Sequence, residues 1–489
     1  NARVNIQPYL PDVVDPSAPA DAKDWFGGGA GGAAPAIVYP FDNTMMAPNI
    51  LQVRIQWQAG GSNKVFRIDA QGPTVQRSFY FGCTGNCTYN IDDKLWSSLA
   101  RSSLNQTVKL TISGVSAKGG PVGTSAPINV RFSPEDARGG LYYFSPTITG
   151  IKRVPLGASA PVDFIRNGNE TGCAGCHGIS RDGKQVAVEF GSGDTRTGSG
   201  IVDGANPMQR KWALTPSISW NYAWFNPTGD RIIANWRSTL VVRNTTDGNQ
   251  VGQITNQQIG GSFGGAMPEW SPDGKYIAFV RNLQGSTYDF ELNSSGDIVV
   301  IPYNNGAFGQ ATLLVKGDPS SDVHIWPTWS PDSKWLIFNS QQCDGAACVQ
   351  YNAQKTRLRL VRAVKDDGTA ATASTPIELV QGTHDKFKSN NWPKFAPFYQ
   401  AGRYGFVIYS ATYGLGFETG GTPQMYMFGV DMEKAKAGAD PSYQPVYLPF
   451  QDRTTNNHSA IWTTDIRCQD DTDCPSDYKC MMSSCTSMM

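Results

Sequence analysis

The sequence has no surplus of charge of either sign and no long apolar run. Its 41 basic residues balance its 41 acidic residues, so the formal net charge is zero. A chain without a basic surplus lacks the electrostatic attraction to nucleic acid and to anionic lipid, so we expect neither as a partner. No run of about 18 apolar residues occurs, and we therefore predict no membrane-spanning helix.

The residues that are abundant indicate an all-β protein. Charged residues make up only 17 % of the chain and aromatic residues 11 %, alongside 52 glycines and 31 prolines. Many turn-forming and aromatic residues with few charges favour short strands over helices. A length of 489 residues exceeds one ordinary core and predicts two or three domains.

The ten cysteines favour an oxidising compartment. They fall into local groups with none left over: Cys83 with Cys87, Cys173 with Cys176, Cys343 with Cys348, and finally Cys468, Cys474, Cys480 and Cys485. Such grouping predicts disulfides in an exported protein, and reduced buried thiols are the alternative. The chain starts at Asn1 rather than at Met, which we interpret as a mature end after removal of a signal peptide. We expect the periplasm, the outer-membrane surface or the extracellular space.

The first third of the chain changes character near residue 40. Residues 1–40 are rich in Pro, Ala and Gly, which predicts an arm or linker. Within residues 41–134, apolar and polar residues alternate over Leu51–Trp57, Val108–Ile112 and Ile128–Phe132, as in half-buried strands. Short strands separated by turns predict a β-sandwich of immunoglobulin or fibronectin type.

Residues 140–466 contain an internal repeat. Each unit has a short strand, a turn of Ser-Pro-Asp-Gly type and an apolar strand that returns. The copies are Ile179–Val188, Phe225–Ala234, Met267–Phe279 and Trp326–Phe338, with weaker ones at 392–397 and 461–463. Proline sets φ in the turn, and Asp with Gly completes the bend. A four-stranded unit with a period of about 45 residues predicts a propeller blade.

The pattern Pro-x-Trp-Ser-Pro-Asp-Gly-Lys-x-Ile-Ala-Phe at Pro268–Phe279 resembles the WD40-like repeat of TolB-type β-propellers. The resemblance covers about two thirds of the chain and implies six blades. The sixth blade would be split, with its inner strand near Trp462 and its outer strands at 140–145 and 150–154. Such a split closes the ring and leaves no exposed edge. Residues 467–489 then form a Cys-rich tail, for which disulfides rank above zinc because the spacing is loose and no His is near.

One motif carries specific chemistry. Cys173-Ala174-Gly175-Cys176-His177 has the Cys-x-x-Cys-His pattern by which c-type cytochromes attach haem: two thiols add to the two vinyl groups, and the histidine binds the iron. A redox dithiol, half a zinc site and a plain disulfide are the alternatives. We predict one covalent haem c, held by Cys173 and Cys176, with His177 as proximal ligand. No helical periodicity surrounds the motif, so we expect the haem in the loop that enters the first blade.

The second iron ligand has few candidates because the chain contains four histidines. When the repeats are aligned, His177 takes the position of Pro268, His458 that of Ala266 and His324 that of Gly265. All three positions lie in segments that enter an innermost strand. We predict His458, from the blade next to the motif, then His324, then Met267 as a thioether ligand. A structural role for His458 and an open sixth position are the alternatives. The tryptophans at 212, 220, 224, 326 and 392 either contact the porphyrin or fill the space between blades.

These features favour an exported monohaem cytochrome that transfers electrons to and from other redox proteins or cytochromes, and assembly into a larger redox complex is a further conjecture. A haem-dependent redox enzyme with an open iron site is the second hypothesis. An envelope or surface protein-binding propeller, as the resemblance to TolB implies, is the third. One fold can host many functions. The visible absorption spectrum of the protein is therefore needed to distinguish these three hypotheses.

Overall fold

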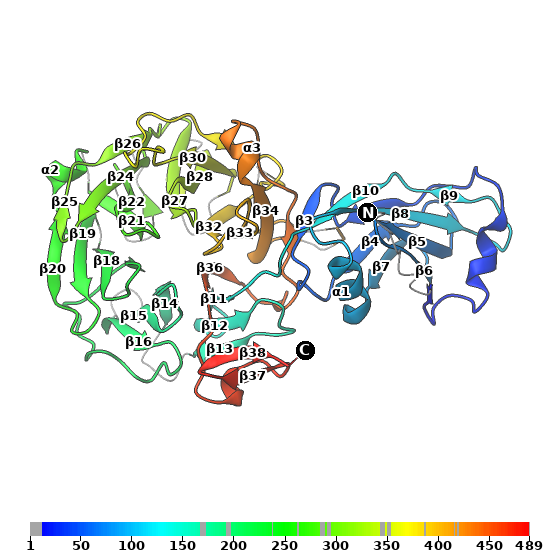
Figure 1. Cartoon of the computed structure of the whole chain (residues 1–489), viewed down its shortest axis with the longest axis horizontal. Coiled ribbons are helices and arrows are strands. Elements are labelled where there is room, and N and C mark those ends of the chain that lie inside the picture. The colour runs from blue at the N-terminus through cyan, green and yellow to red at the C-terminus, as the bar shows by residue number, and fades with distance from the viewer. Residues whose placement is uncertain are drawn as a thin grey trace, which may run out of the picture.

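The computed structural model describes residues 12–166, 173–191, 197–236, 238–261, 264–283, 295–342, 354–385, 388–414 and 420–488, with the short segments 289–290, 348–349 and 416–417. It is mostly β, as the composition predicts. Figure 1 shows two bodies side by side, a group of N-terminal strands and a ring of sheets. Among the described residues, no helix is long and apolar enough to cross a membrane.

The N-terminal body contains two sheets. The larger has the strand order β1-β6-β5-β8-β10-β3, and β9 pairs with β8. Its strands are β1 (Val13–Val14), β6 (Gln76–Gly82), β5 (Val65–Gln71), β8 (Thr107–Val115), β10 (Ile128–Phe132), β3 (Thr44–Met46) and β9 (Gly123–Thr124). The smaller sheet has the order β2-β4-β7, from β2 (Ala36–Tyr39), β4 (Arg54–Gln58) and β7 (Asn86–Asn90). Apolar residues of both sheets share one core that also includes residues of the ring.

The expectation that residues 1–40 form an arm or linker is wrong for the described part of this segment. Val13 pairs with Phe79 in β6, and Ile37 pairs with Trp57 in β4. A 3-10 helix, η1 (Ala22–Gly27), lies between these strands. Pairing with neighbouring strands overrides a composition that is typical of linkers, because it satisfies the backbone hydrogen bonds of the segment.

One helix of this body was not predicted. Helix α1 (Asp93–Arg101) begins after Asp92, whose side chain accepts hydrogen bonds from the backbone N–H groups of Lys94 and Leu95. It buries Trp96 and Leu99. An Asp cap with apolar residues spaced along one face is an ordinary helix signal, so this helix could be predicted from the sequence.

Among the described residues, six antiparallel sheets surround the ring's centre. Their orders are β13-β12-β11-β36, β14-β15-β16, β17-β18-β19-β20, β21-β22-β24-β26 with β25 on β24, β27-β28-β30-β31 and β32-β33-β34-β35. Their bounds are β11 (Gly140–Ser145), β12 (Gly150–Pro155), β13 (Val162–Ile165), β14 (Ala174–Ile179), β15 (Gln185–Phe190), β16 (Gly198–Asp203), β17 (Tyr222–Phe225), β18 (Arg231–Trp236), β19 (Thr239–Asn244), β20 (Gln250–Ile254), β21 (Gly265–Trp270), β22 (Tyr276–Arg281), β24 (Asp297–Asn304), β25 (Ala307–Phe308), β26 (Thr312–Val315), β27 (Asp322–Trp329), β28 (Trp335–Gln342), β30 (Thr356–Arg362), β31 (Ile377–Glu378), β32 (Asn390–Phe395), β33 (Tyr404–Ala411), β34 (Gln424–Asp431), β35 (Val446–Tyr447) and β36 (His458–Thr463).

Smaller elements decorate the ring. They are β23 (Asp289–Phe290), which pairs with β29 (Cys348–Val349), and the short helices α2 (Asn256–Ile259) and α3 (Met432–Lys436). Cys343, the expected partner of Cys348, lies outside the described residues.

The innermost strands contact one another in cyclic order. β14 contacts β17, β17 contacts β21, β21 contacts β27, β27 contacts β32, β32 contacts β36, and β36 contacts β14. In Figure 1 the sheets surround a common centre. The sheet that joins the two ends of the ring combines distant segments, because Leu141 in β11 pairs with Trp462 in β36.

The repeated turn explains why its aspartates are not free for catalysis. In Ser271-Pro272-Asp273-Gly274, the Ser271 hydroxyl donates to Asp273 at 2.7 Å and accepts from the Tyr276 N–H at 3.0 Å. The Asp273 carboxylate also accepts from the Lys275 N–H, and Gly274 takes the positive φ of 75° that the bend needs. The carboxylate therefore serves the turn itself, as the sequence predicts.

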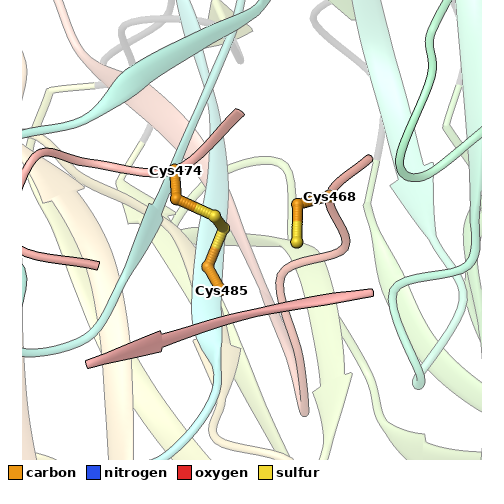
Figure 2. A group of neighbouring side chains, drawn as sticks. All are labelled: Cys468, Cys474 and Cys485. Atoms are coloured by element: carbon orange, nitrogen blue, oxygen red, sulfur yellow. A yellow bond between two sulfur atoms is a disulfide. The ribbon is translucent and has the colours of Figure 1, made fainter. Parts of the chain in front are cut away.

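The C-terminal tail is a small disulfide-bonded unit beside β12 and β13 (Figure 1). It contains the 3-10 helix η3 (Asp471–Asp473) and the hairpin β37 (Tyr478–Met481) and β38 (Ser484–Ser487). Disulfides join Cys468 to Cys480 and Cys474 to Cys485, and Figure 2 shows Cys468 beside the second one. Because these sulfurs form disulfides, they are not thiolate ligands for zinc. Cys83 and Cys87 form the predicted disulfide of the N-terminal body.

Candidate functional site

A cavity lies at the centre of the ring. Every innermost strand contributes to its wall: Cys176 and His177 from β14, Tyr222 and Trp224 from β17, Met267 from β21, Trp326 from β27, Trp392 and Lys394 from β32, and His458 from β36. Cys173, which directly precedes β14, and Phe144 from β11 complete the part of the wall next to the motif. The cavity therefore brings together both cysteines and the histidine of the motif and residues from every sheet of the ring.

The innermost strands turn these side chains into the cavity by a repeated bulge. In five of them the pairing shifts by one residue, and a non-glycine residue at the bulge has a positive φ. These residues are Cys176 (44°), Met267 (53°), Trp326 (57°), Trp392 (59°) and Ser459 (55°). Strand β17 pairs with β18 without a shift. A β-bulge redirects a side chain at the price of a broken ladder, and here the redirected residues all line the cavity.

The bulges confirm the repeat alignment. Because Cys176, Met267 and Ser459 occupy the same bulge position, His177 corresponds to Pro268 and His458 to Ala266. We expected the motif in the loop before the blade, and this expectation is wrong. Only Cys173 precedes the strand, and residues 174–177 belong to β14.

The motif cysteines are thiols rather than disulfide sulfurs, and both are half-buried. A backbone hydrogen bond fixes Cys173, because the Gly191 N–H donates to the Cys173 carbonyl at 2.7 Å. Burial, helped by the nearby Glu189 carboxylate, raises the pKa of the Cys173 thiol. Glu189 is buried on β15 and lines the cavity. A lone carboxylate in the apolar run of β15 is the sequence signal by which this residue could have been found.

His177 is buried beside the motif. Its Nε2 lies 3.3 Å from the Tyr142 carbonyl oxygen. Burial lowers the pKa of His177 to about 4, so the imidazole is neutral at ordinary pH. The neutral form is the one that binds a metal ion.

His458 faces the same cavity from the neighbouring strand and is 2 % exposed. Its Nδ1 lies 2.8 Å from the Asn456 side-chain oxygen. Burial, and to a smaller extent the nearby His177, lowers the pKa of His458 to about 3. The structure thus places two neutral imidazoles from adjacent innermost strands at one cavity.

The other candidate ligands are placed differently. His324 is buried between blades, with Nδ1 3.0 Å from the Ser340 hydroxyl and its ring 5.2 Å from that of Phe338. Met267 does line the cavity, and its sulfur accepts a hydrogen bond from the Trp326 N–H at 3.4 Å. His384 lies at the N-terminal body, with its ring stacked 4.0 Å from that of Phe41.

Aromatic rings form the wall across from the motif. The rings of Trp326 and Trp392 are 3.6 Å apart at an angle of 31°, and the Tyr222 ring meets Trp326 edge-on at 4.7 Å. Of the tryptophans singled out from the sequence, residues 224, 326 and 392 line the cavity, whereas Trp212 and Trp220 pack in the core between β15, β16 and β18.

A buried ion pair connects strands across the ring. The Lys394 ammonium bonds the Glu269 carboxylate and lies 4.1 Å from the centre of the Trp224 ring. Glu269 also accepts from the Thr328 hydroxyl at 2.9 Å and from the Trp329 N–H at 2.8 Å. These contacts join β32, β21, β17 and β27 at one ion pair, which the sequence did not indicate because Lys394 and Glu269 are far apart in the chain.

The groups at the cavity fit a haem. Both thiols of a Cys-x-x-Cys-His motif, a neutral imidazole within the motif and a second neutral imidazole border one space. Its remaining wall is largely aromatic and apolar, which suits a flat macrocycle. The donor set of thiols and imidazoles is the one that covalent attachment and iron ligation require.

No protein-family model matches the chain, and no curated protein matches it. Solved structures do resemble it. A protein assigned as TolB from Agrobacterium tumefaciens is 14 % identical, with 66 % of this chain and 98 % of that chain covered at a TM-score of 0.37. A DUF4784 family protein from Bacteroides caccae is 10 % identical over 88 % of this chain and 98 % of its own, at 0.33. A protein assigned as a 6-phosphogluconolactonase from Bacteroides uniformis is 16 % identical over 65 % and 97 %, at 0.31.

Proposed function

We propose that this chain is an exported monohaem c-type cytochrome that transfers electrons through a haem bound at the centre of its ring of sheets. The observation that carries the proposal is the shared cavity: both motif thiols and two buried neutral imidazoles border it. A dithiol motif alone would be ambiguous, since redox and zinc motifs share the Cys-x-x-Cys spacing. An aromatic cavity with a second imidazole is an arrangement that haem needs and a redox dithiol does not.

The finer architecture belongs to the same proposal. We take the ring to be a six-bladed propeller that the β11–β36 pairing closes, and the N-terminal sheets to be a β-sandwich of immunoglobulin type. The cyclic contacts among innermost strands support the first assignment. The common core of the two N-terminal sheets supports the second.

Each residue of the motif has a distinct role. Cys173 and Cys176 would hold the haem through thioether bonds to its two vinyl groups. His177 would bind the iron through its imidazole, whose Nε2 lies 3.3 Å from the Tyr142 carbonyl oxygen. The bound haem supplies a one-electron couple, while the aromatic wall keeps water away from it. Glu189 and Lys394 place one charge of each sign at the cavity.

The setting fits exchange with other redox proteins. The three disulfides of the described residues favour an oxidising compartment, in agreement with covalent haem attachment outside the cytoplasm. Other cytochromes or small redox proteins are the partners that this chemistry implies, and a larger redox assembly is a further extension of the same role.

The test is the visible spectrum of the protein, oxidised and dithionite-reduced, after expression with haem attachment machinery and extraction with acid–acetone. We expect haem to stay with the protein, with sharp reduced bands, and mass spectrometry to find one haem on the peptide that contains the motif. The variant C173A/C176A should lose all covalent haem. The matched control C83A/C87A removes a disulfide of the N-terminal body and should keep its covalent haem.

Loss of all haem from the native chain on extraction would overturn the proposal and leave a protein-binding propeller. Retained haem that is high-spin and binds carbon monoxide would move the function to an enzyme with an open iron site. Equal haem content in C173A/C176A and the native chain would show that the motif does not attach it.

A further inference from the structure

The position of His458 makes it a partner for His177. His458 opens β36, and β36 contacts β14, which carries the motif. Both imidazoles line one cavity and are 8 % exposed or less. Because the two strands are neighbours in the ring, a planar group attached to Cys173 and Cys176 comes within reach of both rings.

Asn456 determines which nitrogen of His458 can bind a metal. Its side-chain oxygen lies 2.8 Å from His458 Nδ1. An amide oxygen only accepts, so Nδ1 carries the hydrogen in this pair and the Nε2 lone pair is directed elsewhere on the ring. Metal-binding histidines commonly donate their second N–H to an oxygen in this way, which fixes the tautomer and the ring orientation.

Neighbouring groups hold the ring and the asparagine in place. The Phe144 ring meets His458 edge-on at 5.3 Å, and the Trp392 ring lies 6.3 Å away. The loop before β36 is fixed by Asn457, whose side chain donates to the Asp452 carbonyl at 2.8 Å. The orientation of His458 is therefore built into the folded chain before any group binds.

The competing ligands are engaged elsewhere. His324 bonds Ser340 and packs on Phe338 between blades. The Met267 sulfur accepts a hydrogen bond from the Trp326 N–H, and ligation would leave that buried N–H in need of another acceptor. Ligation of His458 through Nε2 would keep its bond to Asn456, because that bond uses Nδ1.

We propose that His458 is the second axial ligand of the haem and that Asn456 is its positioning residue, so that the iron is held by two imidazoles. This inference rests on the proposed function. It implies a six-coordinate iron that exchanges electrons without binding a substrate.

The experiment compares spectra of the full-length holoprotein and five variants. H458A should convert the iron to a high-spin form that binds carbon monoxide when reduced, and added imidazole should restore the low-spin spectrum. N456A should keep the haem but weaken the iron–His458 bond, which raises the apparent affinity for carbon monoxide by about 10- to 100-fold. N456D keeps an acceptor oxygen, so it should stay low-spin with a lower midpoint potential, because a carboxylate makes the imidazole more basic.

Two control variants separate positioning from general damage. N457A disturbs the same loop without touching the His458 bond, and it should leave carbon monoxide affinity near the native value. H324A removes a buried histidine that lies between blades, and its spectrum should be native. If N456A and N457A behave alike, Asn456 is structural only and the positioning role is overturned.

The outcomes also separate failure of His458 as a ligand from failure of the proposed function. A native low-spin spectrum in H458A would refute His458 as ligand while leaving the cytochrome intact, and the same measurement on M267A would then test the thioether. A native chain with covalent but high-spin haem would refute two-imidazole ligation and move the function to a haem enzyme, while covalent attachment at the motif would stand. Absence of haem from the native chain would overturn the proposed function itself.

Discussion

Three of the four histidines are buried, and burial is the main cause of the lowered pKa of each, so that each imidazole is neutral at ordinary pH. For His177 and His458 this neutrality belongs to the candidate iron site. For His324, desolvation and then the nearby Arg359 guanidinium lower the pKa to about 4. An imidazole of this kind resists protonation in the folded state only, so it links stability to pH.

We predict that His324 makes the protein less stable in mild acid. The unfolded chain binds this proton near pH 6.5 and the folded chain only near pH 4, so stability falls as pH drops through that window. Between pH 7 and pH 5, the native chain should lose about 2 kcal/mol more unfolding free energy than H324N does. Urea titrations at both pH values measure this, and equal losses would show that His324 does not titrate on unfolding.

The strand that carries the motif packs tightly against its neighbour. A methyl group on Gly178 would overlap the carbonyl oxygen of Ala223 in β17, whereas one on Gly175 would find its nearest atom 3.6 Å away, on the Phe144 ring. The two glycines of one strand thus face different constraints. Gly178 is required for contact between adjacent blades, and Gly175 is not.

This difference predicts the outcome of a matched pair of substitutions. G178A should lower the unfolding free energy by at least about 2 kcal/mol, because backbone cannot move aside easily. G175A should change it by less than about 0.5 kcal/mol. Denaturant titration of both variants, with haem content measured alongside, is the check. A stable G178A would mean that β14 and β17 separate more readily than their contact indicates.

On the scale of the whole molecule, one buried arginine connects the closing sheet to the tail. Arg153 on β12 donates to the carbonyl oxygens of Gly204, Arg467 and Asp473 at 2.9, 2.8 and 3.1 Å. Its guanidinium also pairs with the Asp473 carboxylate at 3.1 Å, and its side chain is 2 % exposed. The tail therefore covers the place where the first and last segments of the ring meet.

We predict that R153A loosens this closure. Loss of a buried cation that satisfies three carbonyl groups should cost about 3 kcal/mol and expose the tail to protease. Limited proteolysis with mass spectrometry, together with urea titration, would show both effects. The control R166A removes an arginine that is 64 % exposed in a surface pair with Asp163, and its stability should stay within about 0.5 kcal/mol of native. If the tail of R153A still resists protease, the disulfides alone hold the tail in place.

The sequence by itself determined the features that depend on local contacts. The Ser-Pro-Asp-Gly turns were predictable because their hydrogen bonds close within five residues. The Cys173–His177 motif was readable because its chemistry lies in consecutive positions. The split sheet followed from counting repeats, since an unpaired outer half at one end must meet an inner strand from the other.

Only the tertiary structure decided which histidines face the cavity. His458 is one residue before its bulge at Ser459, whereas His324 is two residues before its bulge at Trp326. Successive side chains of a strand point to opposite faces, so this difference of one position sends His458 into the cavity and His324 between the blades. Tertiary contacts likewise placed Asn456 on His458, joined Lys394 to Glu269, and drew residues 13–39 into sheets, because each depends on neighbours that sequence spacing does not specify.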